Sequence, residues 1–312
     1  MKKSSIVILM ATFNGEKYLR EQIESILKQT YTDWHLIVRD DGSTDSTLSI
    51  LKYYQKVYPN KITIIINNGN KHGAKENFFF LSKLALKEKY KYIMYSDQDD
   101  IWKINKIAVT LKQLKEVEEN GKIPVLVHTD LEVVDSKLNV ISSSFIKYSK
   151  LDNNDSLSHL LIQNNITGCT MLINRALLLK GLNIKNDEKI IMHDWWFALV
   201  AAIYGKVVLL NKSTILYRQH GDNVVGAKKI NLYSMLKKAF EFNKNRFSLI
   251  QTINQASVLV DSYPNLPLEK ENIIMGYSQI KNKSKIKRIY FVKHNNILKN
   301  SFMRRLGEYI FI

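Results

Sequence analysis

The first third of the chain alternates between continuous apolar runs and segments with apolar residues at helical spacing. Four of the runs have the length of strands buried on both faces: residues 5–11, 34–38, 62–66 and 92–95. The first intervening segment carries Leu19, Ile23 and Ile26 on one side of a helix. This alternation predicts an α/β fold, with a mostly parallel central sheet flanked by helices.

The pattern is less regular after residue 100. We expect helices at residues 103–119, 155–163, 175–179 and 193–204. We expect short strands at residues 125–130, 170–173, 206–210 and 214–217, with a partner for the first of them near 131–135. Residues 226–312 read as mainly helical, with a break near residues 263–267. The chain therefore divides into an α/β domain, residues 1–225, and a C-terminal helical region, residues 226–312.

Polar segments follow three of the predicted strands, at residues 12–15, 40–45 and 97–100. Right-handed crossovers place the carboxyl ends of parallel strands on one rim of the sheet, where ligands bind. We therefore expect these three segments to converge on one rim and to form the functional site.

The third of these segments contains three carboxylates in four residues, Asp97, Asp99 and Asp100. Crowded carboxylates repel one another and are tolerated where a hard cation or several donors share their charge. Mg²⁺ or Mn²⁺, held by one or two carboxylates and completed by substrate phosphates, suits such a cluster. The alternative is an acidic turn that simply ends the strand. Asp100 is also suited to cap the helix that begins near residue 103.

The net charge of +17 is distributed unevenly. Residues 226–312 hold 16 Lys and Arg against 5 Asp and Glu, which gives this region +11. Basic clusters at residues 281–288 and 304–305 are interleaved with apolar and aromatic residues. Such a region suggests an anionic partner, either a membrane surface or nucleic acid. A helical appendage with a solvated basic face is the alternative.

The chain shows no export or membrane-spanning signal. The apolar run at residues 6–11 is too short for a secretion signal and is interrupted at Asn14 and Gly15. The longest uncharged apolar run, residues 195–205, is too short to cross a bilayer. The single cysteine, Cys169, excludes an intramolecular disulfide and suits a reducing cytosol as a buried strand residue. We expect a cytoplasmic protein, with peripheral contact at the inner face of the membrane.

The three polar segments together resemble family 2 glycosyltransferases. Residues 11–19, Ala-Thr-Phe-Asn-Gly-Glu-Lys-Tyr-Leu, and residues 40–45, Asp-Asp-Gly-Ser-Thr-Asp, are similar to the family's first two motifs. Residues 96–102, Ser-Asp-Gln-Asp-Asp-Ile-Trp, look like its metal motif of two aspartates separated by one residue. The resemblance covers about residues 4–225. It implies a GT-A fold and inverting transfer of a sugar from a nucleotide diphosphate donor.

The resemblance extends to a rhamnosyltransferase-like subgroup through Gln98, Trp102 and residues 193–196, His-Asp-Trp-Trp. It implies dTDP-rhamnose as the donor and bacterial surface polysaccharide synthesis as the setting. A UDP-sugar donor is the alternative. The processive branch of the family carries a Gln-x-x-Arg-Trp signature, and residues 217–220, Tyr-Arg-Gln-His, stand here instead. This departure favours the addition of one sugar to a glycan or lipid-linked glycan.

The resemblance assigns the nucleotide to the first two segments. Asp41, with its neighbour Asp40, would hold the base, since a carboxylate accepts from the imide N–H of uracil or thymine. Thr12, Phe13 and Asn14 would line the base and the ribose. The alternative for these segments is helix capping, for which Asn14 is also suited.

The resemblance assigns the diphosphate and the metal to residues later in the chain. Asp97 and Asp99 would hold the ribose and a Mn²⁺ or Mg²⁺ ion, with Asp99 the more direct metal ligand. Arg218 would reach the diphosphate. His220 is a further candidate metal ligand, or a polar loop histidine.

The resemblance places the acceptor near the helix at residues 193–204. Asp194 would be the general base that deprotonates the acceptor hydroxyl, and His193 either tunes it or belongs to the core. Trp195 and Trp196 would form a wall for sugar stacking, or else pack in the core. We also assign Gly168 to the acceptor or sugar side.

Other classes of function fit the sequence less well. A non-enzymatic basic protein that binds nucleic acid or membrane leaves the acidic strand ends unexplained, and no nucleic-acid-binding motif is present. A sugar nucleotidyltransferase or a dinucleotide-dependent dehydrogenase would open with a glycine-rich loop, which residues 12–15 are not. We therefore expect a glycosyltransferase that takes no nucleic acid as a partner.

Overall fold

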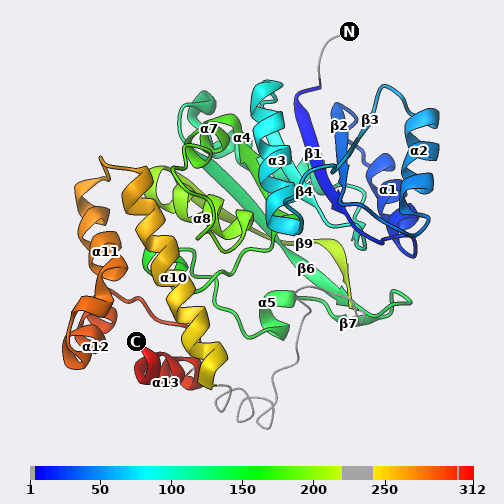
Figure 1. Cartoon of the computed structure of the whole chain (residues 1–312). Helices are drawn as coiled ribbons and strands as arrows, with labels where there is room; N and C mark the ends of the chain where they lie inside the picture. Colours follow the sequence, from blue (N-terminus) through cyan, green and yellow to red (C-terminus); the bar gives the residue numbers. More distant parts are fainter. Residues whose placement is uncertain (1–3, 220–241, 301) are drawn as a thin grey trace.

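The computed structural model describes residues 4–219, 242–300 and 302–312 (Figure 1). Its strands form one sheet in the order β3-β2-β1-β4-β8-β6-β9-β5, with β7 paired to β6. Their bounds are β1 Ile6–Thr12, β2 Trp34–Asp40, β3 Ile62–Ile66, β4 Tyr92–Ser96, β5 Ile101–Trp102, β6 Val125–Val134, β7 Val140–Ser142, β8 Leu172–Asn174 and β9 Lys206–Arg218. The first four strands are parallel, as the sequence predicts, whereas β8 and β5 add antiparallel pairs.

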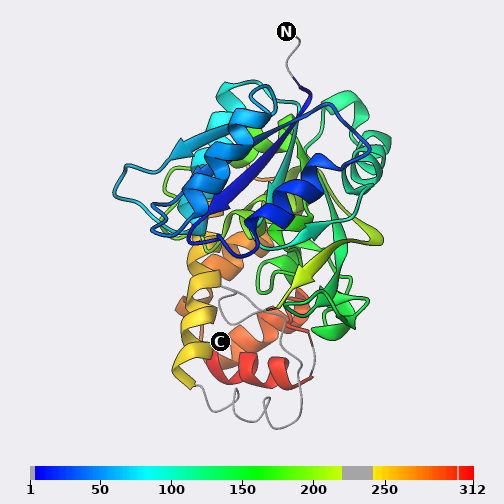
Figure 2. The same cartoon turned by 90° about the vertical axis from the view of Figure 1, so that its right-hand side faces the viewer.

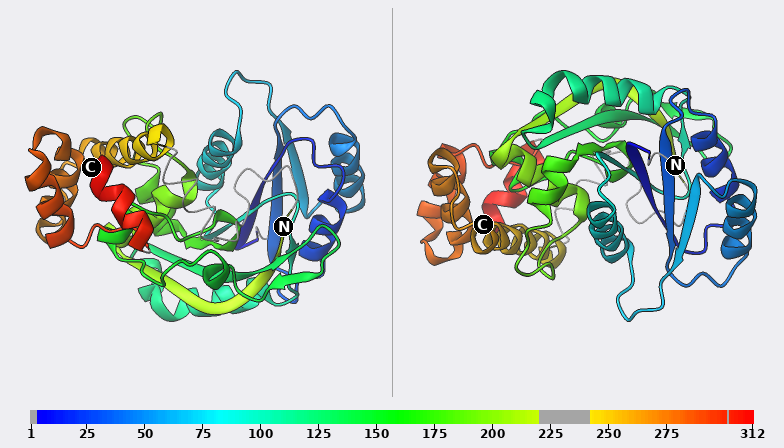
Figure 3. Two further views of the ribbon diagram at one scale, coloured as in Figure 1. Left: turned by 90° about the horizontal axis from the view of Figure 1, so that it is seen from below. Right: turned by 90° about the horizontal axis from the view of Figure 1, so that it is seen from above.

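Helices cover both faces of this sheet, and Figure 3 shows the sheet curving between them. Those of the α/β part are α1 Leu19–Leu27, α2 Thr47–Val57, α3 Ala74–Lys87, α4 Lys106–Val117, α5 Phe145–Tyr148, α6 Leu157–Leu160, α7 Arg175–Gly181 and α8 His193–Tyr204. Short 3₁₀ turns occur at Glu119–Gly121, Gly168–Thr170 and Ile280–Asn282. The C-terminal helices are α10 Phe242–Ser262, α11 Leu268–Ser278, α12 Lys285–His294 and α13 Phe302–Phe311.

The alternation of side chains along each strand produces two hydrophobic clusters. On β1, Ile6, Ile8 and Met10 face the cluster that α1, α2 and α4 complete. Val7 and Leu9 face the opposite cluster, which α3, α7 and α8 cover. Because both faces are buried, the strands are continuous apolar runs, and this is why their positions were predictable.

The C-terminal helices pack against the second of these clusters. Leu259 of α10, Tyr263 directly after it, and Ile274 and Tyr277 of α11 are buried in it together with residues of α8. The Tyr263 hydroxyl also donates a hydrogen bond of 2.7 Å to the carbonyl oxygen of Lys180. Figures 1 and 2 show α10 to α13 gathered at one end of the molecule, beyond α8. The basic C-terminal region is thus tied to the α/β part by a shared core.

Three expected elements differ in the structure. Residues 125–134, expected as a short strand and its partner, form the single strand β6. Residues 206–217, expected as two short strands, belong to the single strand β9. Its register against β6 shifts around Asp130 and Ser213, so the polar residues that suggested a break lie at a bulge. The helix expected over residues 155–163 is reduced to the four residues of α6.

Candidate active site

The loops after β1, β2 and β4 begin side by side at one rim of the sheet. In the parallel register, Thr12 lies opposite Asp40, and Met10 lies opposite Ser96. The amide of Asp41 donates to the carbonyl oxygen of Thr12 at 2.8 Å and extends this pairing into the loop. The expected convergence of the three polar segments is confirmed.

Asp40 organises the loop after β2 from within. Its Oδ1 accepts hydrogen bonds from Thr12 Oγ1 at 3.0 Å and from Ser43 Oγ at 2.6 Å. Its Oδ2 accepts from the amides of Gly42 and Ser43 at 3.2 and 2.9 Å. Gly42 has a φ of +85°, a conformation that glycine adopts without strain. Because both carboxylate oxygens are engaged and the side chain is buried, Asp40 shapes the loop that presents Asp41.

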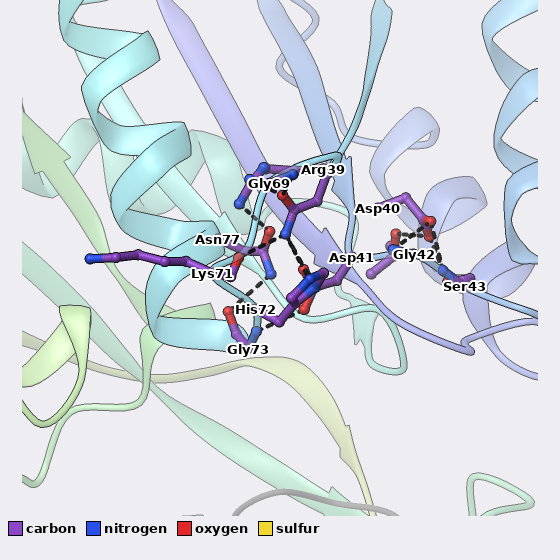
Figure 4. Close-up of polar contacts among 12 residues, drawn as sticks. Arg39, Asp40, Asp41, Gly42, Ser43, Gly69, Lys71, His72, Gly73 and Asn77 are labelled. Carbon is purple, nitrogen blue, oxygen red and sulfur yellow. Dashed lines mark hydrogen bonds and ion pairs between the residues drawn. The ribbon is translucent and has the colours of Figure 1, made fainter.

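Asp41 is the centre of a second network, drawn in Figure 4. Its Oδ1 accepts from Asn67 Nδ2 at 2.5 Å and lies 3.1 Å from His72 Nδ1, and its Oδ2 accepts from the Gly73 amide at 2.7 Å. Burial opposes the charge of this carboxylate, but these hydrogen bonds outweigh it and lower the pKa of Asp41 below its usual value. Asp41 is therefore held ionised and oriented.

Arg39, two residues before Asp41 on the same side of the chain, joins this network through Asn67. Its guanidinium donates to Asn77 Oδ1 at 2.6 Å and to Asn67 Oδ1 at 2.5 Å. It also lies over the ring of Phe80, 4.1 Å from its centre. Asn67 thus donates to Asp41 while it accepts from Arg39. The sequence pattern does not indicate a role for these residues. In the structure, Ile66 lies opposite Asp40 in register, and this places Asn67 beside Asp41.

The loop after β1 is fastened to the loop after β2. Asn14 has a φ of +46°, and its Oδ1 accepts from the Thr44 amide at 2.9 Å. The expectation that Asn14 caps the first helix is wrong, because its side chain reaches across to the neighbouring loop. The Gly15 amide donates to Thr47 Oγ1 at 2.7 Å. Phe13 remains 55% exposed on the rim and is available to a ligand.

The surroundings of Asp97 disfavour its negative charge, as expected of a carboxylate in a cation site. Burial raises its pKa to about 7, and the nearby carboxylates of Asp99 and Asp194 add to the effect. A divalent ion would relieve this repulsion, and carboxylate oxygens are ligands that Mg²⁺ and Mn²⁺ prefer. The residues at the end of β4 therefore fit a hard divalent cation, with Asp97 and Asp99 as the carboxylates that would hold it.

Asp100 belongs to a buried cluster behind the rim. Among the described residues, ligand-type atoms of Asp97, Asp100 and Cys169 lie within 4.8 Å of one another. Burial raises the pKa values of Asp100 and the Cys169 thiol, and Lys106 is fully buried close to both. Because Lys106 supplies a cationic side chain beside Asp100 and Cys169, we regard these two residues as polar core. The expectation that Asp100 caps a helix is wrong, since α4 begins at Lys106 after Asn105.

Arg218 is buried and fully engaged within the protein. Its guanidinium donates to the carbonyl oxygens of Asp99 at 3.0 Å and Ser136 at 2.9 Å and to Glu21 Oε2 at 2.5 Å. It also lies 4.4 Å from the centre of the Tyr18 ring. The expectation that Arg218 reaches the diphosphate is therefore corrected, because Arg218 holds the backbone of the acidic loop. The other candidate from this segment, His220, lies outside the described residues.

Asp194 opens α8 on the far side of the acidic loop. Its Oδ2 accepts from the Gly168 amide at 3.1 Å, and its Oδ1 accepts from the Trp195 amide at 2.6 Å. Burial raises the pKa of Asp194 to about 7, against the opposite effect of these two bonds. A carboxylate with a pKa near the working pH is suited to general base catalysis.

The neighbours of Asp194 have different environments. His193 packs against Phe78 and Tyr95, with ring centres 4.2 and 4.7 Å away, and burial lowers its pKa to about 3. It is therefore a neutral core histidine. Trp196 is fully buried and donates to the carbonyl oxygen of Gly181, so the expectation that it stacks on a sugar is wrong. Trp195 is half-buried and donates to the carbonyl oxygen of Leu160 at 2.6 Å, which fixes its ring beside Asp194.

Solved structures of other proteins share this fold. Residues 1–349 of TarS from S. aureus, in complex with UDP-GlcNAc, align with a TM-score of 0.52 and 17% identity over 97% of this chain and 90% of that one. The mannosyltransferase PcManGT from Pyrobaculum calidifontis, in complex with GDP-Man and Mn²⁺, aligns with a TM-score of 0.53 and 13% identity over 95% and 74%. These similarities establish the GT-A fold.

The chain belongs to Glycosyl transferase family 2, whose family model matches residues 7–179. It is 31% identical to the dTDP-rhamnosyl transferase RfbG of Shigella flexneri over 287 residues, which are 86% of this chain and 92% of the relative. An uncharacterized glycosyltransferase of Haemophilus influenzae is 27% identical over 81% of this chain and 79% of its own length. The protein is therefore a glycosyltransferase, and the alternative of a non-enzymatic basic protein is set aside.

Proposed function

We propose that this glycosyltransferase moves one sugar, with inversion, from a nucleotide diphosphate donor to a glycan or lipid-linked glycan. The observation that carries the proposal is the meeting, at one rim, of an oriented Asp41, the acidic pair Asp97 and Asp99, and Asp194. Asp41 suits a nucleobase, Asp97 and Asp99 suit a metal-bound diphosphate, and Asp194 suits an acceptor hydroxyl.

Each of these residues has a separate role in the proposed reaction. Asp41 accepts from the imide of the base, and Phe13 lies against the nucleoside. Asp97 and Asp99 would hold the divalent ion, which when bound neutralises charge on the leaving diphosphate. Asp194 removes the proton from the acceptor hydroxyl. The hydroxyl oxygen bonds to the anomeric carbon of the donor sugar while the bond from that carbon to the donor phosphate breaks. A single displacement of this kind inverts the anomeric centre.

We propose dTDP-rhamnose as the donor, in bacterial surface polysaccharide synthesis. The support is the RfbG relative, a dTDP-rhamnosyl transferase matched along almost its whole length. A UDP-sugar is the second candidate. TarS is solved with UDP-GlcNAc, and a 28% identical relative from Escherichia coli is a UDP-Glc-dependent glucosyltransferase acting on a diphosphoundecaprenol-linked sugar. A pyrimidine base is common to both donors and matches an acceptor-only Asp41.

We also propose that the end of the molecule formed by α12 and α13 rests on an anionic membrane surface. The two helices adjoin, since Lys285 Nζ donates to the carbonyl oxygen of Ile310 at 2.7 Å. Ile286 and Tyr290 on α12 are 82% and 67% exposed, and Ile310 on α13 is 61% exposed. The exposed basic residues around them are Lys281, Lys287, Lys293 and Arg305. Each basic residue near such a surface contributes about 1 kcal/mol of binding.

This membrane contact would be peripheral and would bring the site to a lipid-linked acceptor. In the parts of the chain that the structure describes, no helix combines the length and the apolar character needed to cross a bilayer.

Donor turnover tests the proposed reaction without knowledge of the acceptor. The protein is incubated with dTDP-rhamnose, UDP-glucose or GDP-mannose, with Mn²⁺ or with a chelator, and release of the nucleoside diphosphate is followed. Slow metal-dependent release from dTDP-rhamnose supports the proposal. Release from UDP-glucose alone moves the donor to the second candidate, and release only from GDP-mannose contradicts a pyrimidine nucleotide as the donor.

A further inference from the structure

Gln98 stands between the two aspartates of the acidic motif, but its side chain reaches the loop after β1. Its Oε1 accepts from the Phe13 amide at 2.9 Å, and its Nε2 donates to the Phe13 carbonyl oxygen at 3.0 Å. One carboxamide thus satisfies both backbone groups of one residue, as a neighbouring strand would. Because each end of the amide has a matching partner, its orientation is fixed.

Gly15 provides the space for this pairing. A Cβ atom at position 15 would lie 2.4 Å from Gln98 Oε1, which is far inside contact distance. Position 15 and position 98 therefore depend on each other, although neither neighbours the other in the chain. Gly15 is needed for the close approach and not for a left-handed backbone.

The pairing joins the two ends of the proposed donor site. Phe13 belongs to the exposed loop that would contact the nucleoside, and Asp97 and Asp99 would hold the ion on the diphosphate. On its other side, the loop is fastened by Ser43 Oγ, which accepts from the Asn14 amide at 2.9 Å. Gln98 thus adds a direct link from the nucleoside loop to the acidic motif.

We propose that Gln98 is a positioning residue that sets the separation between the nucleoside loop and the metal-binding carboxylates. The proposal rests on the proposed donor and metal site. When both ends are held at the spacing that one nucleoside diphosphate spans, the second contact forms at a high effective concentration. Without this link, each end still binds, but the affinity for the whole ligand falls because the loop must be ordered during binding.

The variant that tests this proposal is Gln98→Met, because it keeps the length of the side chain and removes both hydrogen bonds. Gln98→Glu is less suitable because it places another negative charge beside Asp97 and Asp99. Gln113→Met is the control, since it makes the same chemical change on a partly exposed position of α4.

Calorimetry compares two ligands for the parent and both variants: the tighter of dTDP and UDP with Mn²⁺, and the matching monophosphate without metal. We expect Gln98→Met to weaken diphosphate binding about tenfold, as two neutral hydrogen bonds allow, and to weaken monophosphate binding less than threefold. An equal loss for both ligands indicates simple disorder of the loop and overturns the proposal, as does no loss. If the parent itself binds neither diphosphate, the proposed function fails together with this inference.

A double-mutant cycle with Gly15→Ala gives a second test that does not depend on the methionine variant. In the parent, the added methyl displaces the Gln98 amide and should weaken diphosphate binding about as much as Gln98→Ala does. In the Gln98→Ala background, the space is vacant and Gly15→Ala should add less than a twofold loss. Additive losses would show that the two positions act separately and would overturn the proposal.

Discussion

The backbone amide of Gly168 donates a hydrogen bond of 3.1 Å to Oδ2 of Asp194. This bond ties the turn at Gly168–Thr170 to the start of α8. The next residue of the turn, Cys169, is buried beside Asp97. One turn therefore lies between the proposed general base and the acidic motif. Its packing is close, since a Cβ on Gly168 would lie 3.0 Å from His193 Nε2. Gly168 therefore contributes its backbone amide to Asp194. The sequence had led us to expect a direct contact with the acceptor or the sugar.

Asp194→Asn should abolish most transfer while leaving the donor site intact. The asparagine keeps the size of the side chain but cannot accept the proton of the acceptor hydroxyl. We expect kcat to fall by about 10²- to 10⁴-fold, the usual range for a general base, with an unchanged Kd for the nucleoside diphosphate. Asp261→Asn, an exposed position on α10, is the control. A variant that retains more than a tenth of the parent kcat would remove Asp194 from the reaction.

The pH dependence of transfer should show the titration of Asp194. Its pKa is raised to about 7, and a general base must be deprotonated to act. The rate should therefore fall as the pH drops below about 7, by about tenfold for each further unit, and level off above it. Initial rates between pH 5.5 and 8.5 at saturating donor measure this limb. A rate that is constant down to pH 5.5 would contradict the assignment.

Replacement of Trp196 should lower the stability of the fold, whereas replacement of Trp195 should affect acceptor binding. Trp196 is fully buried and stacks with Tyr263 at 6.2 Å between ring centres, so Trp196→Ala should cost about 3–5 kcal/mol of folding free energy. Trp195 is half-buried beside Asp194, and Trp195→Ala should act mainly on the KM for the acceptor. Chemical denaturation and acceptor titrations separate the two effects. Similar stability losses for both would place Trp195 in the core as well.

Arg218 should matter for stability and for the acidic loop. Arg218→Met leaves the carbonyl oxygens of Asp99 and Ser136 and the half-exposed Glu21 without their donor, so we expect a loss of about 2–3 kcal/mol, as for buried acceptors left unsatisfied. Urea denaturation measures the loss, with the exposed Arg246→Met as the control. A fully stable Arg218→Met variant with weakened diphosphate binding would restore the original expectation for this residue.

The exposed face of α12 should govern membrane contact. Ile286→Asp replaces an apolar residue by a charge of the same sign as the lipid and should reduce cosedimentation with phosphatidylglycerol vesicles several-fold. Leu268→Asp is a matched control, because Leu268 is also 82% exposed but lies on α11. Neither variant should bind phosphatidylcholine vesicles appreciably. Equal effects of both substitutions would indicate that α12 has no special role.

The sequence predicted the strands and the rim because both depend on periodicity and connection. Runs such as residues 6–11 are apolar throughout because they are covered on both faces, and parallel strands place their following loops together. The position of Asp41, Asp97 and Asp99 at this rim was therefore predictable without coordinates, whereas their roles remain predictions.

The roles of Arg218, Trp196 and Asn67 were not predictable in the same way. Residue type indicates which contacts a side chain can make, but not which way it points. Arg218 turns inward to three chain segments, and Trp196 contacts Gly181 at the end of α7 and Tyr263 directly after α10. Asn67 belongs to a loop whose approach to Asp41 follows only from the register of β2 and β3.

The most direct test of the account is calorimetric binding of dTDP, UDP and GDP to the parent and to Asp99→Ala, each with and without Mn²⁺. We expect the parent to bind dTDP or UDP tightly only with Mn²⁺, to bind GDP weakly, and to lose the effect of Mn²⁺ in Asp99→Ala. Preference for dTDP would favour the rhamnose donor. The account would be contradicted if the parent bound none of the three, or if Asp99→Ala kept the full effect of the metal.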